Sequence, residues 1–251
     1  MIGGANPVAG GGPVVLGLDT ATASSAVALR LADGSTTQAR DDPRPGEHPG
    51  HATRLLEMAH ELLDEAGRSW SVIERIAVGV GPGTFTGLRV GVATARGLAQ
   101  SLSAELVGVS SLQALASAAL ATEPSVDSVL AVIDARRGEV FAATYGRSGE
   151  TAPARALAPE GLSTIIGEVR SGRWLAVGDG ALRYPAAIEA LGVPAPPADS
   201  PLHLVSAAAI CALGVHATPA SGLEEIVPDY RRRPDAELAL AAAGARRAPR
   251  S

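Results

Sequence analysis

The stretch AVGVGPGTFTGLRVGVATARGLAQSL, residues 77–102, constrains the fold more than any other part of the chain. It continues a short apolar run, residues 76–80, which predicts a buried parallel strand. A Gly-Pro turn follows. Apolar residues then recur at helical spacing and predict an amphipathic helix: Leu88, Val92, Ala95, Ala99 and Leu102. A strand, a tight turn and a helix in this order indicate an α/β fold.

Small residues form a ridge along the predicted helix, because Gly87, Gly91 and Ala95 recur every four residues. A glycine inside a helix costs about 1 kcal/mol relative to alanine, so close packing is expected to compensate. The ridge can pack either on the chain's own sheet or on a helix of another protein. Both alternatives stay open at this point, and the partner-facing one is favoured.

One interpretation of the turn before this helix is a phosphate cradle, since backbone N–H groups at a helix N-terminus attract anions. A Walker A loop needs a lysine after its last glycine, whereas Leu88 follows Gly87 and the chain contains no lysine. The spacing also differs from the G-x-G-x-x-G dinucleotide fingerprint. A structural or partner-facing turn is therefore the favoured interpretation.

Composition narrows the function classes. The net charge of −5 gives no overall basic field for nucleic acid, and the 3% aromatic content predicts an aliphatic core. The only cysteine, Cys211, cannot form an internal disulfide, which favours a reducing compartment and a buried thiol. The leader, residues 1–13, lacks the features of a signal peptide, and no apolar run is long enough to span a membrane. We expect a cytoplasmic protein.

The layout repeats once. Strands predicted at residues 14–18 and 25–31 open the first half, and strands at 128–134 and 139–145 open the second. We expect a disordered leader (1–13), an N-terminal subdomain (14–112), a C-terminal subdomain (113–200) and a disordered Arg- and Ala-rich tail (233–251). A helix at 202–217 is expected to pack back on the first subdomain, and residues 144–159 are expected to form a loop.

Four stretches together resemble the TsaB (YeaZ) family over residues 14–233. They are VLGLDTATASSAVAL (15–29), GPGTFTGLRVGVATARGLA (81–99), LAVIDARRGEV (130–140) and PDYRR (228–232). The resemblance implies an α/β, actin-like (ASKHA, RNase H-like) fold of two related subdomains with mixed sheets flanked by helices. The two hairpin-led halves agree with this independently.

The resemblance also implies a function. TsaD transfers threonylcarbamoyl to N6 of adenosine 37 in tRNAs that read ANN codons, and members of this family are its non-catalytic partners. The implied assemblies are a heterodimer with TsaD and a larger complex with TsaE, with tRNA bound only through the complex. Whether the chain forms a homodimer when TsaD is absent stays open.

The implied partner surface lies on two helices, residues 51–66 and 86–102, which meet their TsaD counterparts in a four-helix arrangement. Arg89 and Arg96 share one face of the second helix and either pair with partner acids or stay solvated. The expected interface comprises Leu55, Ala59, Leu62, Thr86, Gly87, Arg89, Val90, Gly91, Thr94, Ala95 and Leu98.

No catalytic residue, metal or cofactor is expected. The family's metal-binding relatives carry H-x-x-x-H on the first long helix, but here Leu55 stands four residues after His51, which we expect at the surface or at a helix cap. The turns that would face a nucleotide are expected to be structural, with their acids bonding turn N–H groups. A residual nucleotide site at Asp19, Thr20, Asp134, Gly178, Asp179 and Gly180 is the alternative.

Two rival functions remain. The first is an actin-like ATPase or kinase acting on a small metabolite. The second is an inactive metallopeptidase-like homologue, because relatives of this fold have carried glycoprotease labels. The missing histidine pair, and the absence of an H-E-x-x-H motif from the sequence, count against the second.

Overall fold

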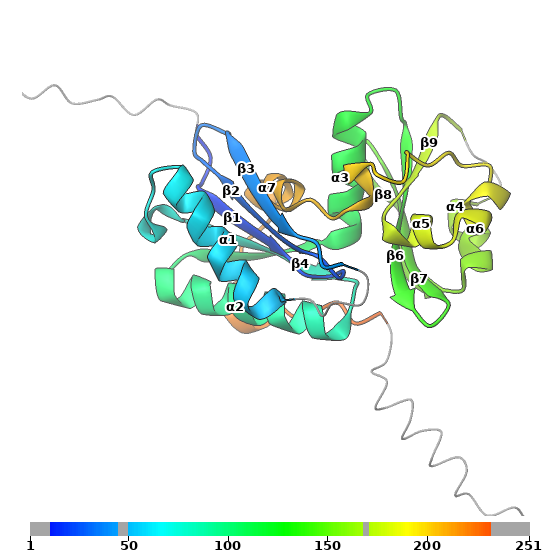
Figure 1. The fold of residues 1–251 in the computed structure, drawn as a ribbon. Coiled ribbons are helices and arrows are strands. Elements are labelled where there is room, and N and C mark those ends of the chain that lie inside the picture. Colours follow the sequence, from blue (N-terminus) through cyan, green and yellow to red (C-terminus); the bar gives the residue numbers. More distant parts are fainter. Residues whose placement is uncertain (1–10, 45–49, 168–170, 232–251) are drawn as a thin grey trace, which may run out of the picture.

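The computed structural model describes residues 11–44, 50–167 and 171–231. The expected leader is thus described only from Gly11, and the expected tail lies outside the described residues. Two mixed sheets, each flanked by helices, stand beside one another (Figure 1). Within the described residues, no helix has the length and apolar character needed to cross a membrane.

The first sheet has the order β3-β2-β1-β4-β5. An antiparallel meander, β1 (Val15–Asp19), β2 (Ser25–Arg30) and β3 (Thr36–Asp41), forms one side. β4 (Arg75–Gly81) and β5 (Glu105–Ser110) continue it in parallel, with Leu16 opposite Ile76 and Leu106 opposite Ile76 on the other side. Apart from Asp19 at the end of β1 and Arg75 at the start of β4, both strands are apolar because both of their faces are covered.

Helices cover both faces of this sheet. α1 (His51–Glu65) and α2 (Phe85–Leu102) lie on the face that carries Leu16, Leu18 and the inward stripes of both helices. α7 (Ala207–His216) lies on the opposite face (Figure 1). Its approach is close because a Cβ on Gly17 would sit only 2.6 Å from the sulfur of Cys211. Cys211 is fully buried, as predicted.

The second sheet, in the order β8-β7-β6-β9, repeats the first design. β6 (Ser128–Arg136), β7 (Glu139–Gly146) and β8 (Gly149–Leu157) form a meander, and β9 (Trp174–Val177) pairs in parallel with β6. The prediction of a loop over residues 144–159 is wrong, since β8 occupies most of it. β8 is a largely exposed edge strand, so it lacks the apolar pattern of the central strands.

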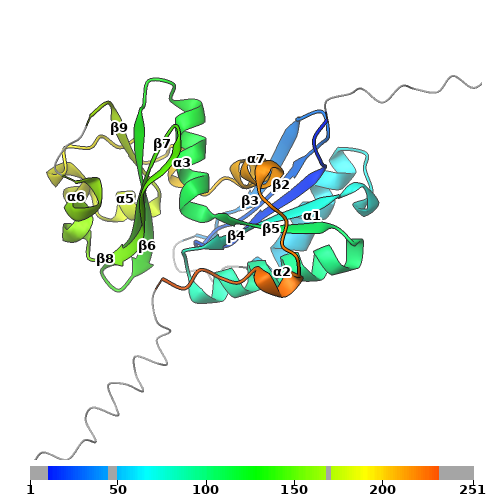
Figure 2. The same cartoon turned by 180° about the vertical axis from the view of Figure 1, so that it is seen from behind.

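α3 (Ser111–Thr122) lies between the two sheets, and its small buried residues join both in one apolar cluster with α7. On the far face of the second sheet lie α4 (Ser163–Ile166), α5 (Asp179–Arg183) and α6 (Pro185–Ala190). Residues 222–231, which we call the strap, then return across α2 toward the second sheet (Figure 2). Two of its contacts, from Arg96 to the Ile226 carbonyl and from Arg231 to the Ala154 carbonyl, mark its course.

Candidate functional site

Six of the eleven predicted interface residues face the chain's own core. Leu55, Ala59 and Leu62 of α1 are at most 4% exposed and pack against the first sheet. They share the cluster with Leu16 and Val27. These three side chains therefore anchor α1 to the sheet. The expectation that they contact a partner directly is wrong, because they are buried within the chain itself.

The small-residue ridge also packs inward. The Thr20 hydroxyl donates a hydrogen bond of 2.7 Å to the Gly87 carbonyl, and a Cβ on Gly91 would collide with that same hydroxyl. Ala95 is fully buried. The glycines thus let α2 approach the end of β1, and the alternative of packing on the chain's own sheet is confirmed. The partner-facing interpretation of Gly87, Gly91 and Ala95 is wrong.

The remaining predicted residues are accessible. Thr86 and Arg89 are exposed, and Val90, Thr94 and Leu98 are half-buried along the same helix. Sequence reasoning missed Leu56, which is 45% exposed on α1 although its neighbour Leu55 is fully buried. The sequence did carry a signal for this residue, because Leu56 is apolar yet lies outside the helical stripe that faces the core. We define the α1–α2 face as Leu56, Thr86, Arg89, Val90, Thr94 and Leu98.

Arg96 is neither solvated nor free for a partner. Its guanidinium donates hydrogen bonds of 2.9 Å and 2.6 Å to the carbonyl oxygens of Glu224 and Ile226. Ile226 in turn packs against the core cluster beneath α2. Arg96 therefore holds the strap on α2, a long-range contact that helical spacing alone does not reveal.

Asp19 lies at the end of β1 and is 1% exposed. Its carboxylate accepts hydrogen bonds of 2.9 Å from the Ala21 N–H and 2.6 Å from the Ser111 hydroxyl. Burial raises the pKa of Asp19, and these two hydrogen bonds oppose that rise. The adjoining glycine, Gly79, leaves room for this carboxylate, because a Cβ there would overlap it.

The β1–β2 turn is filled by the chain itself. The Thr84 N–H donates a hydrogen bond of 2.7 Å to the Ala21 carbonyl, and a Cβ on Gly83 would overlap that carbonyl. The loop before α2 thus lies directly on the turn that would face a nucleotide phosphate.

The equivalent turn of the second half is built around Asp134, which is 6% exposed. It accepts a 2.9 Å hydrogen bond from the Arg136 N–H, as Asp19 does from Ala21. The expectation that both acids bond turn N–H groups is confirmed. The Asp134 carboxylate also lies 3.4 Å from the guanidinium groups of Arg136 and Arg183.

Gly178, Asp179 and Gly180 begin α5 and do not form an isolated turn. Gly178 has a φ of +104°, and Gly180 packs so closely on β6 that a Cβ would meet Val132 at 2.7 Å. Asp179 accepts a 3.0 Å hydrogen bond from the Asp134 N–H. Burial, with Asp134 nearby, raises the pKa of Asp179 to about 6.

The expectation of a surface or capping role for His51 is wrong. His51 is 6% exposed, and its Nδ1 lies 2.8 Å from the hydroxyl of the buried Ser25 on β2. Burial lowers the pKa of His51, and Asp41 partly opposes this. Among the described residues, no group of three or more His, Cys, Asp or Glu side chains is arranged to hold a metal ion.

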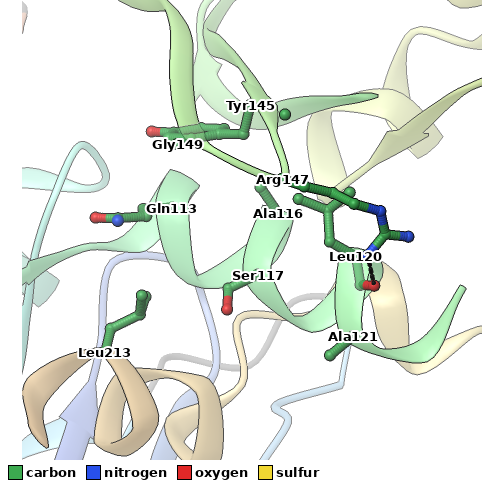
Figure 3. Close-up of a pocket in the computed structure, with 10 residues that line it drawn as sticks. Gln113, Ala116, Ser117, Leu120, Ala121, Tyr145, Arg147, Gly149 and Leu213 are labelled. Atoms are coloured by element: carbon green, nitrogen blue, oxygen red, sulfur yellow. Dashed lines mark hydrogen bonds between the residues drawn. The ribbon is translucent and has the colours of Figure 1, made fainter. Parts of the chain in front are cut away.

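A cavity of about 300 Å³ lies between α3, α7 and the β7–β8 hairpin (Figure 3). Arg147 at its edge donates hydrogen bonds of 2.8 Å to the carbonyl oxygens of Pro124 and Val126, in the segment that follows α3. None of the predicted site residues lines the cavity, whose walls are Gln113, Ala116, Ser117, Leu120, Ala121, Tyr145, Gly146, Arg147, Gly149 and Leu213.

This chain is similar in sequence to proteins of one tRNA-modification pathway. Residues 47–165 match the family model of TsaD, described as tRNA N6-adenosine threonylcarbamoyltransferase. The tRNA threonylcarbamoyladenosine biosynthesis protein TsaB of Escherichia coli K12 is 38% identical, over 68% of this chain and 73% of the relative.

Two solved structures from Pseudomonas aeruginosa are similar to this one. A protein described as similar to the peptidase YeaZ has a TM-score of 0.72 at 31% identity, covering 88% of this chain and 100% of that one. YeaZ has a TM-score of 0.69 at 30% identity, covering 87% and 99%. Together with the duplicated sheet order, these matches confirm the predicted two-sheet, actin-like fold.

Proposed function

The chain belongs to the TsaB (YeaZ) family, and we propose that it is the non-catalytic partner of a TsaD-type transferase. Its relative in E. coli is a tRNA threonylcarbamoyladenosine biosynthesis protein, and the role of this family in that pathway extends to this chain. The reaction supported is the N6-threonylcarbamoylation of adenosine 37 in tRNAs that read ANN codons. Because the substrate of this reaction is tRNA, we expect the protein to act in the cytoplasm.

One observation carries the non-catalytic part of the proposal: the carboxylates of both turns, Asp19 and Asp134, bind groups of the chain itself. Asp19 is 1% exposed and satisfied by Ser111 and Ala21. Asp134 is paired with two arginines. A carboxylate that acts on a nucleotide or on water needs access to it, and these two serve as turn anchors.

The docking site in this proposal is the α1–α2 face. Leu56 of this face is 45% exposed, and Phe85, which precedes Thr86 at the start of α2, is 36% exposed; both are among the few large apolar side chains exposed in the described chain. Exposed apolar side chains next to half-buried ones are typical of protein interfaces. The buried ridge and the α1 stripe keep the two helices at a fixed spacing, so a pair of partner helices meets a rigid surface.

The test is a reconstitution with TsaD from the same organism, tRNA and threonylcarbamoyl-adenylate, read out as modified adenosine. We expect modification to depend on this chain, and the chain alone to show no ATP turnover. TsaE is added last, since it belongs to the larger assembly. Equal modification without the chain, or ATP hydrolysis by the chain alone, contradicts the proposal and favours the enzyme rival.

A further inference from the structure

An aromatic and cationic cluster stands where the strap meets the beginning of α2. The rings of Phe85 and Tyr230 lie 5.1 Å apart, and the guanidinium carbon of Arg89 lies 3.7 Å from the Phe85 ring centre. Arg89 Nε donates a 3.0 Å hydrogen bond to the Tyr230 hydroxyl. We call these three residues the arginine clamp. It is exposed, since Phe85 and Tyr230 keep 36% and 43% of their surface accessible.

The strap positions Tyr230 with contacts of its own. Besides the bonds from Arg96, the Asp229 N–H donates a 2.7 Å hydrogen bond to the Val80 carbonyl. Arg231 donates to the Ala154 carbonyl of β8 at 3.2 Å. The tyrosine is thus fixed between two anchored residues, and its hydroxyl holds the guanidinium of Arg89 in one orientation.

Arg89 has no carboxylate partner within the described residues, although most of the other arginines there have one or donate to several carbonyls. α2 contains no acidic residue. The strap acid beside Tyr230, Asp229, pairs with Arg231 at 2.7 Å. Nε of Arg89 is used by Tyr230, and its two terminal nitrogens contact no acceptor in the described part of the chain.

From this geometry we propose that the arginine clamp is the anchor for a carboxylate side chain of the protein partner that docks on the α1–α2 face. This inference rests on the proposed function. A guanidinium fork matches a carboxylate in two parallel hydrogen bonds, and stacking on Phe85 leaves that fork free. Because the fork is already oriented, little side-chain entropy remains to be lost on binding. Arginine and tyrosine are also the residues that dominate interface energies.

The clamp fits a carboxylate better than a nucleic-acid phosphate. Backbone recognition of nucleic acid uses several cations together. Here Arg96, on the same face of α2, is occupied by strap carbonyls, and the guanidinium of Arg89 stacks on the apolar ring of Phe85.

The experiment measures the dissociation constant of the full-length chain with TsaD from the same organism at several salt concentrations. Arg89→Gln is expected to weaken binding by about 10-fold or more and to reduce its salt dependence. Tyr230→Phe keeps the ring and the charge but frees the guanidinium, so we expect a smaller loss of about 2- to 5-fold with the salt dependence kept. Arg155→Gln, an exposed arginine on β8, is the matched control and is expected to bind normally.

The outcomes separate the two proposals. If the wild-type chain does not bind TsaD, both the proposed function and this inference are wrong. If wild type binds and Arg89→Gln binds equally, with unchanged salt dependence, only the clamp is overturned. Binding of tRNA to the isolated chain that is lost with Arg89→Gln also overturns it, because the guanidinium then serves a phosphate. Circular dichroism of each variant checks that the fold is intact.

Discussion

The hydroxyl of Ser111 donates a 2.6 Å hydrogen bond to the carboxylate of Asp19, and both residues are buried. Asp19 ends β1 of the first sheet, and Ser111 begins α3, the helix that lies between the two sheets. One short bond therefore ties the first turn of the fold to its central helix. The structural role of Asp19 is therefore to connect the β1–β2 turn to α3.

Ser111→Ala should destabilise the chain by about 1–3 kcal/mol, because it leaves a buried carboxylate without its side-chain donor. The free energy of unfolding in urea measures this. Ser117→Ala, on the same helix but only half-buried, is the control and should stay close to wild type. Equal stability of all three proteins would show that the Asp19 contact contributes nothing.

Gly91→Ala should destabilise the chain by about 1–3 kcal/mol, since the added methyl group collides with the Thr20 hydroxyl under α2. Gly97 lies on the same helix, and a Cβ added there would have no neighbouring atom within 4 Å. Gly97→Ala should therefore be neutral or stabilise by up to about 1 kcal/mol. Thermal unfolding of both variants gives the comparison. Two changes of the same sign would contradict the inward packing of the ridge.

His51 should make stability depend on pH. Burial holds its folded-state pKa below the ordinary 6.5, so the unfolded chain binds the proton more readily. The stabilisation is present above pH 6.5 and is lost as the pH falls from there through the folded-state value. Between about pH 5.5 and 7.5 this rise of the unfolding free energy with pH adds to the opposite contribution of Asp179, which His60→Gln and His51→Gln both retain. It should persist in His60→Gln, whose histidine is exposed, and flatten in His51→Gln.

Asp179 should make stability depend on pH in the opposite direction to His51. Its pKa is raised from 3.8 to about 6, so the folded chain holds this proton where the unfolded chain has lost it. The stabilisation is complete below pH 3.8 and disappears as the pH rises through about 6. Asp179→Asn, which cannot ionise, should exceed wild type above that pH by on the order of 1–3 kcal/mol. The exposed Asp199→Asn is the control and should match wild type at neutral pH, where a destabilised Asp179→Asn would contradict the prediction.

The central elements were predictable because each carries its own periodic signal. The run at residues 76–80 became β4, and the striped segment after it became α2. The paired strands predicted at the start of each half became the β1–β2 and β6–β7 hairpins. β8 could not be found in this way, because an edge strand with one exposed face has no continuous apolar pattern.

The candidate site was harder to predict because burial depends on tertiary neighbours. The spacing of Gly87 and Gly91 indicated a close approach but not which backbone makes it, and Thr20 lies far away in sequence. Arg89 and Arg96 look alike on the helix, yet the strap occupies one and orients the other. His51 has no sequence signal for its bond to Ser25.

The most direct test of the central claim, that the α1–α2 face binds the transferase, is the affinity of TsaD for two variants that carry the same substitution. Leu56→Asp places a charge on the exposed side of α1, whereas Leu182→Asp does so on α5 of the second half, where Leu182 is 38% exposed. We predict a loss of about 10-fold or more for Leu56→Asp and unchanged binding for Leu182→Asp. Unchanged binding of Leu56→Asp, with both variants folded, would contradict the account.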